Sequence, residues 1–173
     1  MINSLIWHKN VPFKMTFVRW RALMCKLPTN ENLENFEVEA LRCYCCRKQA
    51  LDDIDNIFWQ ELCATHIWIF FPSSLGITTQ QSSLSNYLVQ WCDNKGKNDA
   101  HKTIINILPI VVCWNLWKNR CVAKYGGKTF STSKVNYLIL NDILLILYTI
   151  FSHVNGLLNG PNWLKLWKHA NMR

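Results

Sequence analysis

Hydrophobic residues recur every three to four positions along most of the chain, which is the spacing of amphipathic α-helices. The first such stretch covers residues 11–27, where Pro12 favours a helix start and Pro28 ends the pattern. Its apolar stripe consists of Phe13, Phe17, Trp20 and Met24. The basic side chains of Lys14, Arg21 and Lys26 fall off this stripe, so the pattern predicts one helix with basic flanks.

The same spacing predicts further helices along the chain. Thr29 or Asn30 can cap a short helix that ends near residue 36. The remaining predicted helices cover residues 54–71, residues 98–125 with a bend or restart at Pro109, residues 131–152, and a short basic segment after Pro161. No stretch alternates with a period of two for long enough to predict a sheet.

The predicted fold class is therefore all-α, with an irregular small helical domain that contains a cysteine turn, followed by two long helices. A polar stretch of Thr, Gln and Ser separates these parts. We expect a first domain at residues 5–75, a polar linker with a short helix at 76–99, and a helical region at 100–170.

Composition places the chain among proteins with a packed core. Half of the 173 residues are hydrophobic and 17% are charged, with 9 Trp and 8 Cys. No secretory signal is recognisable, which favours thiols or metal ligands over disulfides. The most apolar stretch, residues 137–151, contains Asn141 and Asp142 and falls short of the ~20 residues that a bilayer requires. We expect an intracellular protein, nuclear or cytoplasmic, that is neither secreted nor transmembrane.

The net charge of +8 is unevenly distributed. Residues 1–30 carry +5 without a carboxylate, residues 31–61 carry −5, and residues 62–173 carry +8. Basic ends around an acidic middle suit a polyanion such as RNA or DNA. The alternative is that these cations only solvate the outer faces of helices.

The cysteines provide the sharpest local motif. Cys43 and Cys46 have the C-x-x-C spacing that lets two thiolates reach one tetrahedral zinc ion, and Cys63 and His66 follow as C-x-x-H. Together they form a candidate zinc site. The alternative is that the thiols are buried structural groups and that His66 is solvated or caps a helix.

Residues 113–121 combine aromatic and basic residues on one predicted helix, where Trp114 and Trp117 share a face and Lys118 and Arg120 fall toward other faces. Such patches can stack bases and contact phosphates, although core tryptophans with flanking charges give the same pattern. The candidate nucleic-acid contacts are Lys14, Arg19, Arg21, Lys118 and Arg120.

Catalytic motifs are not recognisable. There is no G-x-S-x-G elbow and no glycine-rich phosphate loop. After Glu61 the carboxylates are Asp93, Asp99 and Asp142, too few and too scattered for a two-metal site. Asp52 and Asp53 form the one adjacent pair, and it lies beside the cysteines. We therefore expect a protein that is not an enzyme.

An ordered series of motifs resembles the zinc-binding domain of plant LINE-type (non-LTR) retroelement reverse transcriptases and the segment that joins it to a ribonuclease H domain. The series consists of residues 6–14, 20–31, 43–46, 55–58 and 67–68, with 110–120 similar to the linker. In that family a C-x-x-C pair is followed by a His before an apolar-Phe pair, and by a Cys five residues later. Cys43 and Cys46 match the first pair, whereas Asn56 and Glu61 occupy the other two positions.

The resemblance implies a fragment of a reverse transcriptase without the polymerase and ribonuclease H carboxylates, with zinc as the implied cofactor. We expect a non-catalytic module with nucleic-acid association. The alternative is a structural or protein-interaction helical remnant without metal or activity of its own, as from a pseudogene. The sequence leaves the oligomeric state open.

Overall fold

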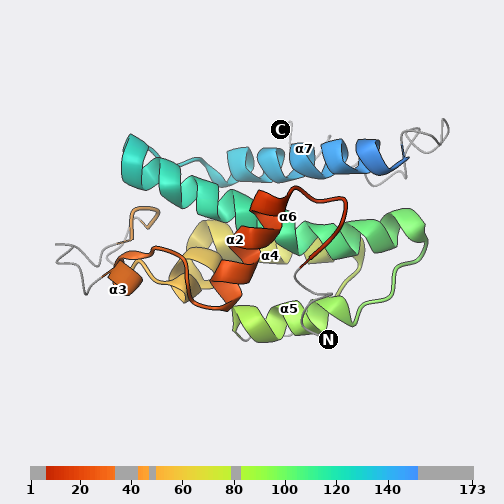
Figure 1. The fold of residues 1–173 in the computed structure, drawn as a ribbon, viewed down its shortest axis with the longest axis horizontal. Helices are drawn as coiled ribbons and strands as arrows, with labels where there is room; N and C mark the ends of the chain where they lie inside the picture. The colour runs from red at the N-terminus through yellow and green to blue at the C-terminus, as the bar shows by residue number, and fades with distance from the viewer. Residues whose placement is uncertain (1–6, 34–42, 47–49, 79–82, 152–173) are drawn as a thin grey trace.

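The computed structural model describes residues 7–33, 43–46, 50–78 and 83–151. Most of the described residues are helical and they contain no β-strand, which confirms the all-α prediction. The elements are α2 Phe13–Leu23, α3 Asn30–Leu33, the π-helical turn η2 Asn56–Gln60, α4 Leu62–Leu75, α5 Leu84–Cys92, α6 Asp99–Gly126 and α7 Thr132–Phe151 (Figure 1). The basic helix predicted after Pro161 lies outside the described residues.

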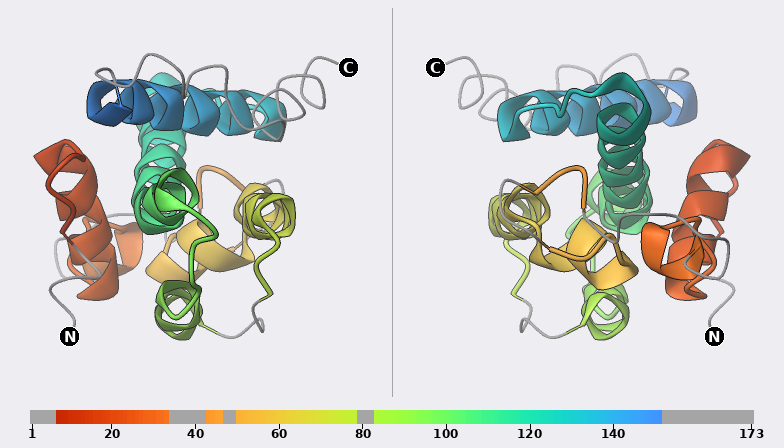
Figure 2. Two further views of the ribbon diagram at one scale, coloured as in Figure 1. Left: turned by 90° about the vertical axis from the view of Figure 1, so that its right-hand side faces the viewer. Right: turned by 90° about the vertical axis from the view of Figure 1, so that its left-hand side faces the viewer.

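The long helix α6 is the centre of the structure. Figure 2 shows it nearly end-on, with α7 lying across it, α2 on one flank, α4 on the other, and α5 on the side away from α7. Residues on several sides of α6 are buried, among them Ile104, Ile105 and Ile110. A helix that is apolar on most sides needs neighbours on most sides, and this explains the arrangement.

The ends of α6 follow from its sequence. The side chain of Asn98 accepts a hydrogen bond from the His101 N–H at 2.8 Å, as an N-cap does. Gly127 ends the helix with a left-handed φ of 66°. The predicted restart at Pro109 does not occur, because α6 continues unbroken from Asp99 to Gly126.

Helix α2 faces its neighbours with an unexpected side. An apolar stripe is typical of the face that a helix turns to the core. Here Met15, Val18 and Ala22 face inward, while Phe13, at the start of the stripe, is 68% exposed. Inspection of the stripe alone therefore selects the wrong face of this helix.

Helix α7 has 20 residues, five more than the apolar stretch considered from the sequence, and by length and composition alone it could cross a membrane. A core helix of a soluble protein passes the same test. Val135, Ile139 and Ile143 on one face of α7 are fully buried, and this helix packs extensively on α6. Its opposite face exposes Tyr137, Leu145 and Tyr148.

A buried ion pair connects distant parts of the chain. The Arg120 guanidinium on α6 donates from Nε to Asp52 Oδ1 at 3.2 Å and from Nη2 to Asp52 Oδ2, and both side chains are almost completely buried. The backbone N–H of Asn30 donates to Asp52 Oδ2 at 2.9 Å, and Lys124 Nζ donates to Asn30 Oδ1 at 2.8 Å. This network joins α3 and the loop before η2 to α6.

We predict that Asp52→Asn lowers the free energy of unfolding by about 3–5 kcal/mol, because it leaves the Arg120 charge buried without its counterion. Urea denaturation measures the change. The control Asp99→Asn, at an exposed position in the first turn of α6, should cost less than about 1 kcal/mol.

The double variant Asp52→Leu with Arg120→Met removes both charges and should be more stable than Asp52→Asn. An Asp52→Asn variant as stable as Asp99→Asn would contradict the central role of this ion pair.

Candidate functional site

The cysteine turn consists of residues 43–46. The N–H of Cys43 donates to the Ala50 carbonyl at 2.8 Å, and the N–H of Cys45 lies 3.4 Å from the Cys43 sulfur. Cys43 is buried, whereas Cys45 and Cys46 are partly exposed. The turn thus places three sulfur atoms at the edge of the core.

Asn56 lies at the first position of η2 and contacts this turn. Its Nδ2 donates to the Leu51 carbonyl at 2.9 Å and lies 3.2 Å from the Cys46 sulfur. The backbone N–H of Asn56 donates to Asp53 Oδ1 at 2.6 Å, which fixes the start of the turn. The position at which the resemblance implies a histidine is therefore beside Cys46, and an amide occupies it.

Glu61 ends η2 and caps α4. Its Oε2 accepts hydrogen bonds from the N–H groups of Cys63 at 2.8 Å and Ala64 at 3.2 Å. Burial raises the pKa of Glu61, and these two backbone hydrogen bonds act against that rise. Glu61, at the position of the family's last cysteine, therefore stabilises the start of α4 as its N-cap.

A cavity of about 820 Å³ opens beside these residues. Its lining includes Cys45, Cys46, Asn56, Glu61 and Cys63. Cys63 and the cysteine turn thus line the same cavity.

The thiols of this cluster differ in acidity. The hydrogen bond from the Cys45 side chain lowers the pKa of Cys43 to about 6, despite burial. Burial raises the pKa of Cys46 to about 11 and that of Cys63 to about 11. Cys43 is the thiol that most readily becomes a thiolate, the form that binds metals.

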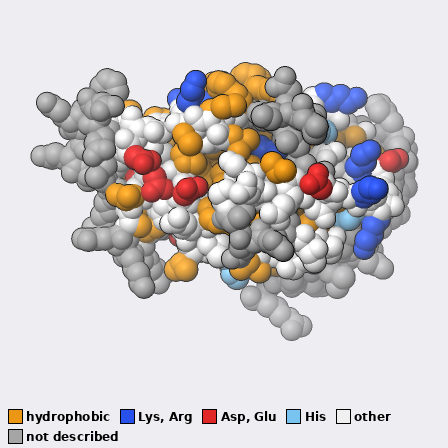
Figure 3. Space-filling view, turned by 90° about the horizontal axis from the view of Figure 1, so that it is seen from below, with side chains coloured by type: hydrophobic (Ala, Val, Ile, Leu, Met, Phe, Trp, Pro, Cys, Tyr) orange, Lys and Arg blue, Asp and Glu red, His pale blue; other side chains and the backbone are white. Residues whose placement is uncertain are grey.

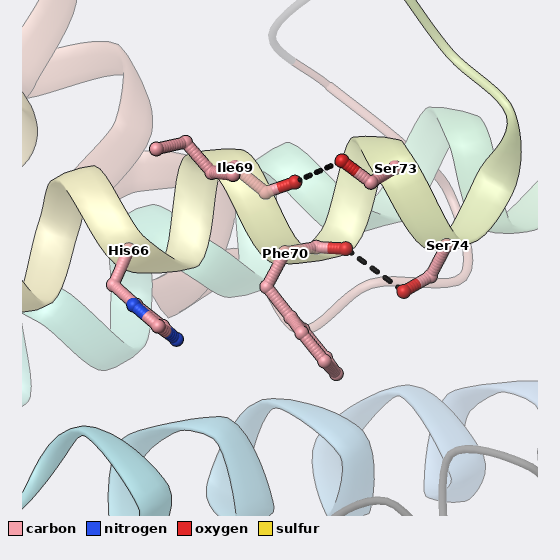
Figure 4. A pocket seen from close by; sticks show the side chains of 5 residues that line it. All are labelled: His66, Ile69, Phe70, Ser73 and Ser74. Atoms are coloured by element: carbon pink, nitrogen blue, oxygen red, sulfur yellow. Dashed lines mark hydrogen bonds between the residues drawn. The ribbon is translucent and has the colours of Figure 1, made fainter.

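His66 does not join the cysteines. It lines a different, shallow pocket on α4 with Ile69, Phe70, Ser73 and Ser74 (Figure 4). The two serines donate to backbone carbonyls one turn earlier, Ser73 to Ile69 at 2.7 Å and Ser74 to Phe70 at 2.8 Å. The C-x-x-H spacing therefore does not produce a shared site, and the predicted set of four ligands is not assembled.

Within the described part of the chain, no group of three or more His, Cys, Asp or Glu side chains is placed to hold a metal ion. The amide of Asn56 is already bonded to Leu51 and Cys46, and an amide is not among the usual zinc ligands. The residues at the family's four positions thus do not fit a tetrahedral zinc. The seven cysteines whose side chains are described are free thiols.

The five candidate nucleic-acid residues separate into two groups. Lys14 is exposed on α2, Arg21 is partly exposed, and Lys118 lies partly exposed on α6. Arg19 and Arg120 are each 1% exposed or less, so their side chains are not on the surface that a phosphate reaches. Burial therefore removes these two from the candidate set.

Sequence inspection missed two features. The Asp52–Arg120 pair joins residues 68 positions apart, and no local motif signals such a contact. The rings of Phe13, Phe17 and Trp20 stack on one another, and the stack continues to Trp7 before the helix. Their spacing in the sequence was the available signal, although it did not reveal that the rings lie on the side of α2 opposite to Met15, Val18 and Ala22.

Comparison with known proteins gives one match. Residues 1–68 match the model of a family described as zinc-binding in reverse transcriptase. No curated protein and no solved structure matches the chain. The part of the chain with the cysteine turn and the start of α4 is therefore similar to the zinc-binding region of reverse transcriptases.

Proposed function

We propose that this protein is a non-catalytic nucleic-acid-binding module, descended from the zinc-binding region of a LINE-type retroelement reverse transcriptase of plants. The observation that carries the proposal is the meeting of two lysines on one tryptophan. Lys14 Nζ from α2 and Lys118 Nζ from α6 each lie 5.4 Å from the centre of the Trp114 ring. Residues 104 positions apart thereby contribute to one cationic surface.

The charges around this surface favour a polyanion. Residues 1–30 carry no carboxylate, so Lys14 and Arg21 have no acidic neighbour in their own segment. Lys118 has one at 3.7 Å, Asp142 on α7, which also accepts from Asn115 Nδ2 at 2.9 Å. A phosphate that contacts Lys14 and Lys118 would compete with Asp142 for one cation only.

The basic residues extend beyond this surface. Seen from below, Lys and Arg side chains gather mainly toward one end of the molecule and Asp and Glu toward the other (Figure 3). Exposed cations at the start of α6 and just before it are Lys95, Lys97 and Lys102. Separated charges of this kind orient an approaching polyanion.

The carboxylates support a non-catalytic role. Asp52 and Asp53 are the adjacent acidic pair, but Asp52 is bonded to Arg120 and Asp53 accepts from the Asn56 N–H. Both oxygens of Asp52 have partners inside the core. Both carboxylates of this pair therefore stabilise the fold. A nuclear or cytoplasmic location suits the proposed nucleic-acid ligand.

The salt dependence of binding tests the proposed phosphate contacts. Affinity for a 15-nucleotide single strand should fall as salt rises. Lys14→Ala and Lys118→Ala should each make the negative slope of log K against log salt less steep by about 0.7, the value for one phosphate contact. Fluorescence anisotropy at several salt concentrations measures the slope.

Lys134→Ala is the matched control, since Lys134 lies 5.1 Å from the Tyr137 ring on α7 and makes a similar cation–π contact. A slope near zero, or equal effects of all three substitutions, would contradict the proposal. Capture of a protein partner without any nucleic-acid binding would favour the structural alternative.

Asn56 occupies the position of the family's histidine ligand, and its side chain is hydrogen-bonded to Cys46 of the cysteine turn. Ligands bonded to one tetrahedral zinc, at about 2.3 Å for sulfur and 2.1 Å for nitrogen, lie about 3.6 Å apart. Asn56 Nδ2 is 3.2 Å from the Cys46 sulfur. A histidine nitrogen at this position is therefore close enough to share an ion with Cys46.

We predict that Asn56→His with Glu61→Cys confers one tightly bound zinc ion per chain, whereas the unmodified chain retains much less. Metal analysis after dialysis against a weak chelator measures the content. Adding Cys46→Ser should abolish the gain, and adding His66→Ala should leave it unchanged. One equivalent of zinc in the unmodified chain, lost on Cys43→Ser or Cys46→Ser, would show that the present residues hold the ion.

A further inference from the structure

Four aromatic rings form a continuous stack along the outside of α2. The rings of Trp7 and Phe13, of Phe13 and Phe17, and of Phe17 and Trp20 each have centroids 5.5 Å apart. The angles between neighbouring planes are 17°, 21° and 26°. We call Trp7, Phe13, Phe17 and Trp20 the aromatic ladder.

The ladder lies on the side of α2 away from the core. Met15, Val18 and Ala22 form the buried face of this helix, and the ladder residues follow one another at helical spacing on the opposite side. Phe13 is 68% exposed and Trp7 is 40% exposed, whereas Phe17 and Trp20 are partly buried. Exposed aromatic groups that are gathered in one place, rather than scattered, mark a binding surface.

Cations border the ladder. The Arg21 guanidinium lies 5.9 Å from the Phe17 ring, and Lys14 occupies the same flank of the helix two turns earlier. Lys9, between Trp7 and Phe13 in the sequence, is exposed as well. An apolar protein surface would leave these charges without partners, whereas a strand with flat bases and a phosphate backbone matches both parts of the surface.

We propose that the aromatic ladder is a base-stacking platform that makes the protein prefer single-stranded nucleic acid to duplex. This inference rests on the proposed nucleic-acid binding and names its substrate class. In a duplex the faces of the bases are covered by their neighbours, whereas a single strand can turn its bases onto protein rings. Phosphates of the same strand contact Lys14 and Arg21 beside the rings.

The experiment measures the binding of four 15-nucleotide probes to the full chain. They are oligo(dT), the same backbone with abasic sites, a duplex of equal length, and oligo(U), which compares RNA with DNA. We expect Phe13→Ala to weaken oligo(dT) binding about tenfold, because it removes the most exposed ring and interrupts the ladder between Trp7 and Phe17. Binding of the abasic probe should not change. Phe13 is largely exposed, so the variant should fold.

Tyr137→Ala is the matched control, because Tyr137 is 56% exposed on α7 and also has a lysine over its ring. Its affinity for oligo(dT) should equal that of the unmodified chain. Circular dichroism and thermal unfolding of both variants establish that they are folded.

The possible failures are distinguishable. If no probe binds even at low salt, the proposed function itself is wrong. If the abasic strand or the duplex binds as tightly as oligo(dT), with normal salt dependence, phosphate binding stands and the stacking platform is refuted. If Phe13→Ala abolishes self-association in sedimentation experiments and leaves oligo(dT) binding unchanged, the ladder joins two copies of the chain, and the inference is overturned.

Discussion

The buried ion pair between Arg120 and Asp52 is the contact on which the arrangement of the N-terminal half depends. Asp52 lies in the loop just before η2 and Arg120 near the end of α6, and Asn30 of α3 bonds to Asp52. Two buried charges are costly unless they face each other with good geometry. The fold must therefore keep this loop against α6, which also holds Asn56 and the cysteine turn in place.

Burial distinguishes the basic residues that stabilise the fold from those that a ligand can reach. The sequence predicts Arg120, which follows two tryptophans, to be a nucleic-acid contact. In the structure its guanidinium is buried and lies 5.0 Å from the centre of the Trp117 ring. Lys118, two residues earlier, points to a different side of α6 and remains partly exposed. Successive helix residues lie about 100° apart, so one basic segment can supply both roles.

The all-α class and most helix positions could be predicted because the three-to-four-residue spacing and the caps are local properties. Asn98 and Gly127 mark the ends of α6 as the sequence indicates. Two features depend on how the helices rotate and pack, which residue spacing does not determine. His66 lines a different pocket from Cys63, and Arg120 pairs with Asp52. The cysteine turn lies between these cases: Cys43 and Cys46 are recognisable by motif, whereas the hydrogen bonds of Asn56 are not.

The orientation of α2 shows why its surface is suited to binding rather than to packing. The smaller side chains of Val18 and Ala22 let α2 lie close to α6, with which it makes one of the most extensive helix contacts in the described structure. The larger rings on the other side would keep the two helices further apart if they faced the core. Because the rings stack on one another, each covers part of its neighbour and the cost of exposing them falls. The stack thereby remains ordered in water, and a base that joins it meets a surface that needs no rearrangement.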